Sequence, residues 1–302
     1  MHNKKHYIAA ISAFVIWGFF SIPLRALSEY SVGEILYFRI LFSLLVLVAI
    51  IAGFKGNDLR KDLTFLKTFS RKERNKIIAL TLVGGALLIV NWLTFIYIVN
   101  NINIKTASFS YMICPVMTAV LGYFLLKEKL TGLQWLAVGL CAVSCVLMGI
   151  NSAIELGYSF LTALGYALYL VSQRRNQGFD RMIILGIQVL FSFLILNLFY
   201  TSLIQEVPVT MEFYTIILVI AVVFTVLPLF LNLYALNRIN SATIGILLYL
   251  NPIFNFVVAF VVFKEKVNLI QLIGYSIIVV ALVLFNYPTF RKLHGAMTEK
   301  FN

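Results

Sequence analysis

The side chains that could do chemistry in this sequence are polar or aromatic residues inside long apolar runs. Arg39 is the most conspicuous, because it lies six residues into an apolar run at 33–53. An ionised group at that depth in a membrane is costly and is usually paired or functional. Arg39 therefore has three interpretations: it receives a substrate carboxylate or phosphate, it pairs with Glu34 or Glu29, or its side chain extends outward to the membrane surface.

Polar, aromatic and proline residues of other apolar runs could line a binding cavity with Arg39. The candidate cavity residues are Trp17, Arg39, Asn91, Trp92, Ser108, Tyr111, Pro115, Tyr166, Asn232, Tyr249, Asn251, Pro252 and Asn255; further intramembrane polar residues include Tyr169, Gln188 and Thr225. Ser108, Tyr111 and Pro115 share one helix face, because they are spaced three and four residues apart. Trp92 and Tyr111 could stack on an apolar or ring-bearing part of a substrate. Each polar member could instead form a hydrogen bond between helices.

The sequence offers no recognisable set of catalytic or metal-ligating residues. All three histidines are terminal, and no Asp lies inside an apolar run. Cys114, Cys141 and Cys145 have no His or carboxylate near them in sequence, so we expect no metal site. The phosphate-binding pattern Gly-x-x-x-x-Gly-Lys-Ser/Thr is absent. We therefore expect neither an enzyme nor a bound cofactor.

The scarcity of titratable groups at membrane depth also bears on energy coupling. A proton-driven pump usually needs a buried carboxylate or His. Here Glu34, Glu128, Glu155 and Glu265 stand only at the ends of apolar runs. A facilitator, an exchanger or a carrier driven by the membrane potential fits better, although Glu34 leaves proton coupling open.

The elements that would position these residues are membrane-spanning helices. Of the 302 residues 61% are hydrophobic and 12% charged, and the mean hydropathy is +0.95, whereas soluble domains are about half apolar and about a quarter charged. Ten runs approach or exceed the roughly 20 residues that cross a bilayer. They are 7–27, 33–53, 77–99, 105–126, 132–150, 154–173, 182–203, 214–236, 242–263 and 268–287. The sequence therefore predicts an all-α integral membrane protein with ten transmembrane helices and no soluble domain.

The distribution of Lys and Arg predicts the orientation of these helices. With the N-terminus in the cytoplasm, 19 basic residues lie inside, eight of them in the connection 54–76, and only 3 lie outside. This asymmetry follows the positive-inside rule, so both ends are predicted to be cytoplasmic. The net charge of +12 then reflects membrane orientation and not nucleic-acid binding. The expected partners are the bilayer and a small-molecule substrate, and the sequence leaves a homodimer open.

An internal repeat divides the chain into two halves. When the sequence is shifted by 137 residues, 11 of the 38 positions in 97–134 are identical to those in 234–271. Pro115 matches Pro252, and the run Lys-Glu-Lys at 127–129 matches that at 264–266. The halves are 1–150 and 151–287, followed by a basic cytoplasmic tail at 288–302. Because each holds five spans, the second half enters the membrane inverted, which is the geometry of alternating-access transporters.

With these features the sequence resembles the drug/metabolite transporter superfamily, and within it the EamA-domain members of the RarD-like branch, the chloramphenicol-sensitivity permeases. The residues that carry the resemblance are Trp17-Gly18, Arg39, Asn91-Trp92-Leu93-Thr94-Phe95-Ile96, Ala107-Ser108, Tyr111, Pro115, Glu128 and Gln134-Trp135 in the first half, and Ser241-Ala242-Thr243-Ile244-Gly245, Tyr249, Pro252 and Lys264-Glu265-Lys266 in the second. The resemblance implies a plasma-membrane carrier without a cofactor, often an exporter of amino acids or related metabolites, whose central cavity is lined by both halves.

The sequence departs from the RarD-like pattern at places that bear on substrate choice. That pattern favours a Glu where this chain has Thr106, and a Gly-Tyr where it has Ser110-Tyr111. The leading hypothesis is therefore a secondary transporter, and an exporter, of small organic metabolites with the exact substrate open. The alternatives are a flippase for a lipid-like or polyprenyl carrier on the same scaffold, and a non-transporting membrane scaffold or sensor.

Overall fold

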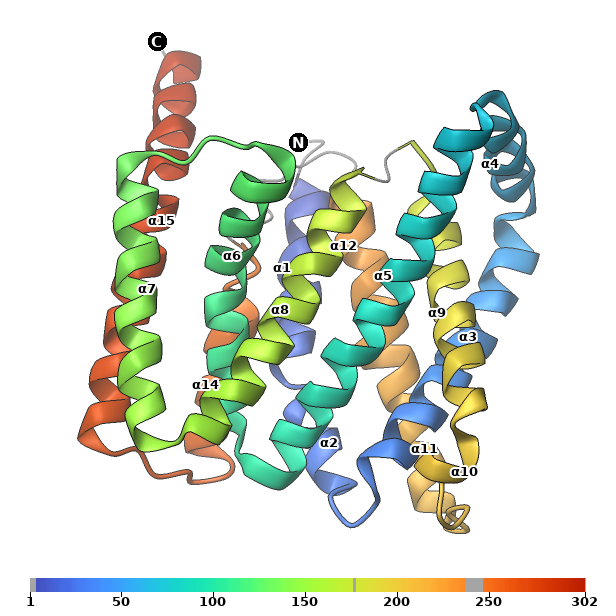
Figure 1. Ribbon diagram of the computed structural model, residues 1–302, viewed down its shortest axis with the longest axis horizontal. Coiled ribbons are helices and arrows are strands. Elements are labelled where there is room, and N and C mark those ends of the chain that lie inside the picture. Colours follow the sequence, from blue (N-terminus) through green and yellow to red (C-terminus); the bar gives the residue numbers. More distant parts are fainter. Residues whose placement is uncertain (1–3, 176–177, 237–246, 302) are drawn as a thin grey trace.

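The computed structural model describes residues 4–175, 178–236 and 247–301, which form helices and turns with no strand among them. The helices run roughly side by side in one bundle, and α1 begins at the end of the bundle where α15 ends (Figure 1). Among the described residues nine helices are long and apolar enough to cross a membrane. The predicted all-helical membrane class is thus confirmed.

The helices follow the predicted apolar runs closely. They are α1 (Lys4–Gly18), α2 (Ser21–Ala26), α3 (Val32–Phe54), α4 (Gly56–Thr68), α5 (Arg71–Tyr97) continued by the π-helix η1 (Ile98–Ile102), α6 (Ile104–Leu126), α7 (Gly132–Asn151), α8 (Ala153–Arg175), α9 (Arg181–Leu198), α10 (Tyr200–Leu203), α11 (Met211–Ala221) continued by the π-helix η2 (Val222–Val226), α12 (Leu227–Leu236), α14 (Leu250–Val261) and α15 (Leu269–Phe301). The predicted span 242–263 falls partly on residues 237–246, outside the described residues, and its described part contains the shorter apolar helix α14.

Three segments differ from the expectation. The first span is interrupted after Gly18, because Pro23 has no N–H to give to the carbonyl of Phe19. The connection 54–76, predicted only as a basic link between two spans, contains α4, whose Leu59, Leu63 and Leu66 recur at helical spacing, and the first turn of α5. At the other end of the chain α15 continues through the basic tail to Phe301.

Polar caps fix where several helices begin. Ser31 accepts a hydrogen bond from the N–H of Glu34 at 3.2 Å, and the Glu34 carboxylate accepts one from the N–H of Ser31 at 3.0 Å. Ser70 and Glu73 form the same reciprocal pair at the start of α5, and Thr131 is paired with Gln134 at the start of α7. These capping boxes satisfy backbone donors that the helix leaves free. Glu34 therefore caps α3.

The buried side chains of the described residues include one large cluster and two smaller ones. The large cluster joins α3, α5, α9 and α11 on one side of the bundle, and a second cluster joins α6, α7, α8 and α15 on the other. Figure 1 shows the same division, with α7 and α15 at one edge and α3 and α9 toward the opposite edge. A third cluster joins α1 and α12. The candidate site lies where these clusters meet.

The two matching Lys-Glu-Lys runs have the same backbone. Lys127 and Lys264 both adopt the left-handed conformation, with φ of 59° and 54°. In each case the N–H of the following glutamate bonds back to the helix, from Glu128 to the carbonyl of Gly122 and from Glu265 to that of Ala259. The corresponding helices α6 and α14 thus end in the same motif.

Candidate functional site

A cavity of about 60 Å³ lies in the interior of the bundle and is lined by both halves of the chain. Its lining residues are Trp17, Phe20, Arg39, Leu88, Asn91, Trp92, Phe95, Tyr111, Tyr166, Tyr169, Leu185, Phe224, Thr225, Leu229, Leu248, Asn251 and Pro252. The first half contributes α1, α3, α5 and α6, and the second contributes α8, α9, η2, α12 and α14. Eight of the 13 candidate cavity residues are among them.

Arg39 forms the charged part of the cavity wall. Its side chain is only 3% exposed, about 10 Å along α3 from Val32. The guanidinium carbon lies 4.7 Å from the ring centroids of both Phe20 and Trp92, so the cation is held between two aromatic faces. Nε donates a hydrogen bond to Oγ1 of Thr225 at 3.1 Å.

The remaining hydrogen-bonding capacity of Arg39 is not used up by the protein. Its Nη1 is buried and has no hydrogen-bond partner in the part of the chain that the structure describes. No described carboxylate forms an ion pair with it, since Glu34 is committed to the cap of α3. Of the three interpretations of Arg39, pairing with Glu34 or Glu29 and extension to the surface do not hold in this structure.

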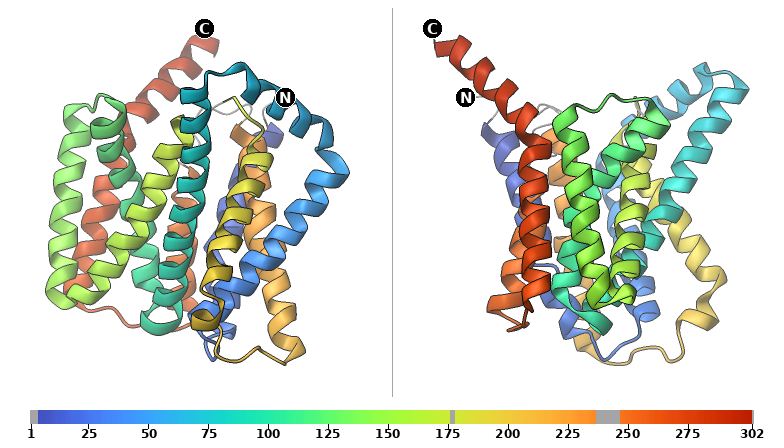
Figure 2. Two further views of the ribbon diagram at one scale, coloured as in Figure 1. Left: turned by 45° about the vertical axis from the view of Figure 1, so that its right-hand side comes forward. Right: turned by 60° about the vertical axis from the view of Figure 1, so that its left-hand side comes forward.

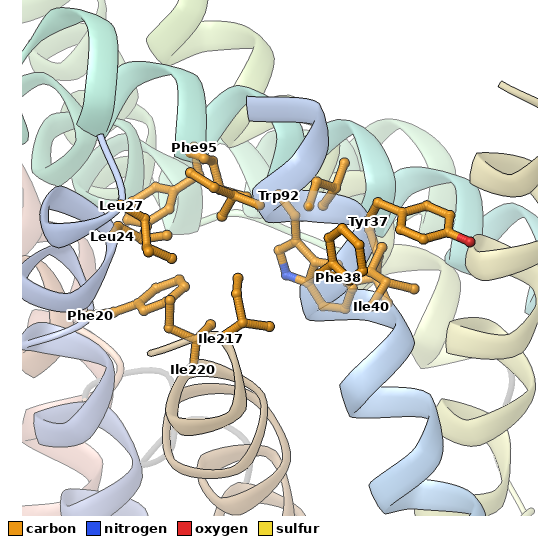
Figure 3. Close-up of a cluster of buried hydrophobic side chains, with 14 of the residues drawn as sticks. Phe20, Leu24, Leu27, Tyr37, Phe38, Ile40, Trp92, Phe95, Ile217 and Ile220 are labelled. Carbon is orange, nitrogen blue, oxygen red and sulfur yellow. The ribbon is translucent and has the colours of Figure 1, made fainter. Parts of the chain in front are cut away.

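Aromatic rings form the larger part of the wall. Tyr111 packs edge-on against Phe95 and Tyr166, with ring centroids 5.3 and 5.8 Å apart, and Tyr166 stacks on Tyr169 at 5.9 Å. Phe20 stacks on Phe95 at 5.7 Å. Figure 3 shows Trp92 and Phe95 extending from α5, and Phe20 approaching from the turn between α1 and α2. The described lining residues thus offer ring faces and edges beside the cation of Arg39.

Asn91 fixes part of this wall by hydrogen bonds to two helices. Its Nδ2 donates to the carbonyl of Thr162 in α8 at 3.0 Å, and its Oδ1 accepts from the hydroxyl of Tyr111 in α6 at 3.2 Å. Asn91 itself is fully buried. It therefore acts first as a connector of α5, α6 and α8, and it sets the orientation of Tyr111.

Trp17 is held by an interruption in the helix opposite. Pro228 has no N–H to give to the carbonyl of Phe224, one turn earlier, and the chain there forms the π-helix η2. Nε1 of Trp17 donates to this carbonyl at 3.0 Å. Thr225 in η2 is the same residue that accepts from Arg39, so η2 provides two of the polar contacts of the cavity wall.

The paired prolines act on the cavity through the backbone. Pro115 removes the N–H that would bond to the carbonyl of Tyr111, and Pro252 does the same for Leu248. Tyr111 and Leu248 both line the cavity and are related by the same shift of 137 residues. The carbonyl of Leu248 accepts instead from the N–H of Asn251 at 3.2 Å.

Five of the candidate residues do not line this cavity. Ser108 donates to the carbonyl of Ile104 within its own helix, and Asn255 accepts from the hydroxyl of Ser21 at 2.6 Å, which joins α2 to α14. Pro115 lies inside α6, and Asn232 is half-buried in α12. Tyr249 packs against the second cluster. Ser108 and Asn255 thus serve contacts within a helix and between helices.

Nine lining residues were not assigned to the cavity from the sequence. They are Phe20, Leu88, Phe95, Tyr169, Leu185, Phe224, Thr225, Leu229 and Leu248. Tyr169 and Thr225 had a signal, since each is polar inside an apolar run. The apolar members had no such signal, because the sequence does not distinguish a Leu or Phe that lines a cavity from one that faces lipid. Only the packing of the helices makes that distinction.

The end of the bundle opposite to α4 (Figure 1) is held together by carboxylates around the start of α6. Glu265 accepts hydrogen bonds from the backbone N–H groups of Ile104 at 2.7 Å and Lys105 at 3.1 Å, and Nη2 of Arg25 lies 3.5 Å from it. A carboxylate is favourable at a helix N-terminus. This clamp joins the second half to the first.

A second carboxylate reaches the same helix start from α8. The hydroxyl of Thr106 donates to Oε2 of Glu155 at 2.6 Å, and Nδ2 of Asn103 donates to the same oxygen at 3.3 Å. A Glu is favoured at position 106 in the RarD-like pattern, and in this chain Glu155 brings a carboxylate to that place. Among the described residues no group of three or more His, Cys, Asp or Glu side chains could hold a metal ion.

Comparison with known proteins places this architecture in a family. The model of the EamA-like transporter family matches residues 4–150 and again 154–287. An "Uncharacterized transporter" of Vibrio cholerae is 30% identical over 299 residues, 97% of this chain and 95% of that protein. Protein RarD of Escherichia coli is 28% identical over 294 residues, 94% of each chain.

The fold is also that of a solved crystal structure. That structure superposes with a TM-score of 0.62 at 15% sequence identity, over 94% of this chain and 97% of the other. The names of the family and of the relatives indicate a transporter and not an enzyme. Because the family model covers nearly the whole chain and the described residues include nine apolar helices, the chain is a multi-pass membrane protein that belongs to the EamA-like transporter family.

Proposed function

We propose that this protein is a secondary transporter of small organic metabolites that carry an anionic group beside an apolar or ring-bearing part. Amino acids and amphipathic drugs belong to this class. The transporter works in the plasma membrane with both ends in the cytoplasm, and its direction is export. The central cavity is the binding site, and the two halves expose it alternately to the two sides.

The observation that carries the proposal is that Arg39 is buried and has no carboxylate partner among the described residues. A buried guanidinium without a carboxylate partner is expensive, and its two aromatic neighbours offset only part of that cost. A substrate carboxylate or phosphate would supply the missing partner for Nη1. A planar guanidinium suits either group, because it can donate two parallel hydrogen bonds.

The ring-lined wall supports the second part of the substrate description. Tyr111, Tyr166 and Tyr169 extend from Phe95 as a chain of ring contacts along the cavity. Such a surface favours an apolar or aromatic group and gives few hydrogen bonds to a strongly polar one.

Alternating access is supported by the relation of the two halves. The family model matches each half separately, and α6 and α14 end in the same left-handed motif at Lys127 and Lys264. Paired proline-interrupted segments at a central site are typical of inverted-repeat transporters. The clamp at Glu265 then keeps one end closed in the present conformation.

The test is ligand-dependent thermal unfolding of the purified full-length protein, followed by flux into liposomes. The panel contains amino acids, chloramphenicol-like drugs, nucleosides, nucleotide sugars and polyamines. A ligand at 100 times its dissociation constant adds about 2.7 kcal/mol of stability. We expect stabilisation by anionic compounds with an apolar part and none by polyamines, and we expect the same compounds to be transported.

The variant Arg39→Gln separates substrate binding from general stability. It should lose the ligand-induced shift and the flux, whereas Lys129→Gln, which removes an exposed charge outside the cavity, should keep both. A ligand that stabilises and crosses with Arg39→Gln as well as with the unchanged protein would refute the role of Arg39. If no water-soluble compound binds, a lipid-like cargo replaces this proposal.

A further inference from the structure

A second cavity lies beneath α4, away from the central site. Figures 1 and 2 show α4 lying across one end of the bundle between α3 and α5. The cavity has a volume of about 100 Å³ and is enclosed by α4, α5, α9 and Phe179. It shares no lining residue with the central cavity, so nothing in the proposed transport cycle accounts for it.

The wall of this second cavity is almost entirely hydrocarbon. Its lining residues are Leu59, Asp62, Leu63, Leu66, Ile77, Ile78, Thr81, Leu82, Phe179, Ile183, Ile184 and Ile187. Leu63, Ile78 and Ile187 are 52%, 42% and 41% exposed, so the cavity is open at its edge. An apolar chain could enter there, and a polar solute would find few partners.

The contacts of α4 with the α8–α9 connection keep the cavity in shape. Phe65 and Phe179 pack with ring centroids 5.2 Å apart. Lys55 forms an ion pair with Asp180 at 2.7 Å, and the carboxylate of Asp62 accepts from the N–H of Asp180 at 2.9 Å. The charge of Asp62 is therefore directed toward the connection and is engaged there.

The rim carries a strong excess of positive charge. The segment 55–76 contains eight basic and three acidic residues, and all three acids have partners inside the segment or on the neighbouring connection. Asp58 pairs with Lys55 and Lys61, Asp62 bonds to Asp180, and Glu73 caps α5 with Ser70. Arg60, Lys67, Arg71, Lys72, Arg74 and Lys76 form no ion pair with any described residue.

We propose that this place is a binding site for an anionic phospholipid, with an acyl chain in the cavity and the phosphate among the bases of α4 and the start of α5. An apolar cavity that is open at its edge, below the amphipathic helix α4 and beside the basic start of α5, matches both parts of such a lipid. A free phosphate would use the charges and leave the cavity without a function. The lipid holds α4 against α5 and α9.

The test measures thermal unfolding and native-mass-spectrometric retention of lipid for the detergent-purified full chain. Three probes are compared: dioleoyl phosphatidylglycerol, dioleoyl phosphatidylcholine and glycerol phosphate. The triple variant R71Q/K72Q/K76Q removes rim charge, and Leu63→Trp fills the cavity. The double variant K127N/K129Q removes two exposed bases from another loop at the same end of the bundle (Figure 1) and serves as the control.

We expect phosphatidylglycerol to raise the unfolding temperature more than phosphatidylcholine, with no effect of glycerol phosphate. Because one Lys or Arg near the surface contributes roughly fivefold to binding, the triple variant should bind about a hundredfold more weakly. Leu63→Trp should also lose the lipid, although it keeps every charge. Equal effects of the two lipids, an equal loss in the control, or full binding by Leu63→Trp would each overturn the proposal.

Discussion

At the scale of single residues, Arg39 shows how a membrane protein tolerates a buried charge. Its cation lies between Phe20 and Trp92, and Thr225 accepts one of its hydrogen bonds. Such contacts contribute about 2 kcal/mol when desolvated, which is less than the several kcal/mol that burial of an ion costs. In the ligand-free protein, part of the desolvation cost of Arg39 therefore stays uncompensated.

This balance predicts the effect of removing the charge without leaving a void. Arg39→Met should unfold at the same temperature as the unchanged protein or a higher one, because the desolvation cost disappears while the ring contacts are replaced by apolar ones. Ligand binding should be lost in the same variant. A lowered unfolding temperature in detergent would show that Arg39 is a structural residue.

Replacement of Asn91 should instead destabilise the protein, because both its side-chain nitrogen and its side-chain oxygen form hydrogen bonds inside the protein. Asn91→Leu leaves the hydroxyl of Tyr111 without its partner, and it removes the hydrogen bond that the carbonyl of Thr162 accepts beside the one within α8. We expect a loss of roughly 1–3 kcal/mol for each buried group left unpaired, measured by denaturant titration in detergent. Asn101→Leu is the control, because Asn101 is exposed and bonds only within its own segment. Equal losses in both variants would contradict this assignment.

At the scale of elements, one of the contacts that attach α4 to the α8–α9 connection is the ion pair of Lys55, the residue before α4, with Asp180. The hydrogen bond to Asp180 is the largest of the effects that raise the pKa of Lys55, and a second bond to Asp58 adds to it. The pKa of Asp58 is lowered by the same contact. A raised lysine pKa stabilises the folded state fully at pH values below that of an unfolded lysine, and the contribution disappears as the pH rises through the raised value.

The attachment of α4 should therefore be insensitive to pH between neutrality and about pH 9. Hydrogen exchange of residues 56–68 measures it directly. Lys55→Gln should exchange faster than the unchanged protein at every pH in this window, whereas Lys61→Gln should not, because Lys61 is largely exposed and the ion pair that it forms with Asp58 is 3.5 Å long. If both variants exchange alike, the ion pair with Asp180 does not hold α4.

At the scale of the whole molecule, the two halves meet at the central cavity and at the Glu265 clamp. The clamp is built from a residue of the second half that contacts Ile104, Lys105 and Arg25 of the first. If the halves move against each other during transport, this end must open and the contacts of Glu265 must break.

A crosslink across the clamp tests that movement. With Cys114, Cys141 and Cys145 replaced by Ala, Arg25→Cys and Glu265→Cys are joined by a short thiol crosslinker of about the combined length of the two original side chains. Flux should stop when the crosslinker is added and return when a cleavable one is reduced, while ligand binding persists. Undiminished flux through the crosslinked protein would exclude opening at this end.

The sequence by itself determined the membrane class and most of the apolar helical segments. A bilayer requires each crossing to be a continuous apolar helix of a certain length, so long apolar runs predict spans directly, and the caps at Ser31 and Thr131 are local in sequence. Two further features have a local signal in the sequence. Pro23 accounts for the break after Gly18, and the spacing of Leu59, Leu63 and Leu66 is that of the helix α4. Neither feature was predicted, because a charged connection need not be helical, and a long apolar run indicates a span without showing where the helix is interrupted.

Only the tertiary structure decided which of the polar and aromatic residues meet. Arg39 touches Thr225 across 186 residues, and Trp17 touches Phe224 across 207. Ser108 and Tyr111 share a helix face, yet only Tyr111 lines the cavity. In a helix surrounded by lipid and protein, the apolar pattern is nearly uniform around the axis, so it fixes the length of a span but hardly its rotation. The rotation comes from packing against distant helices, and it assigns each side chain to the cavity, to a neighbouring helix or to lipid.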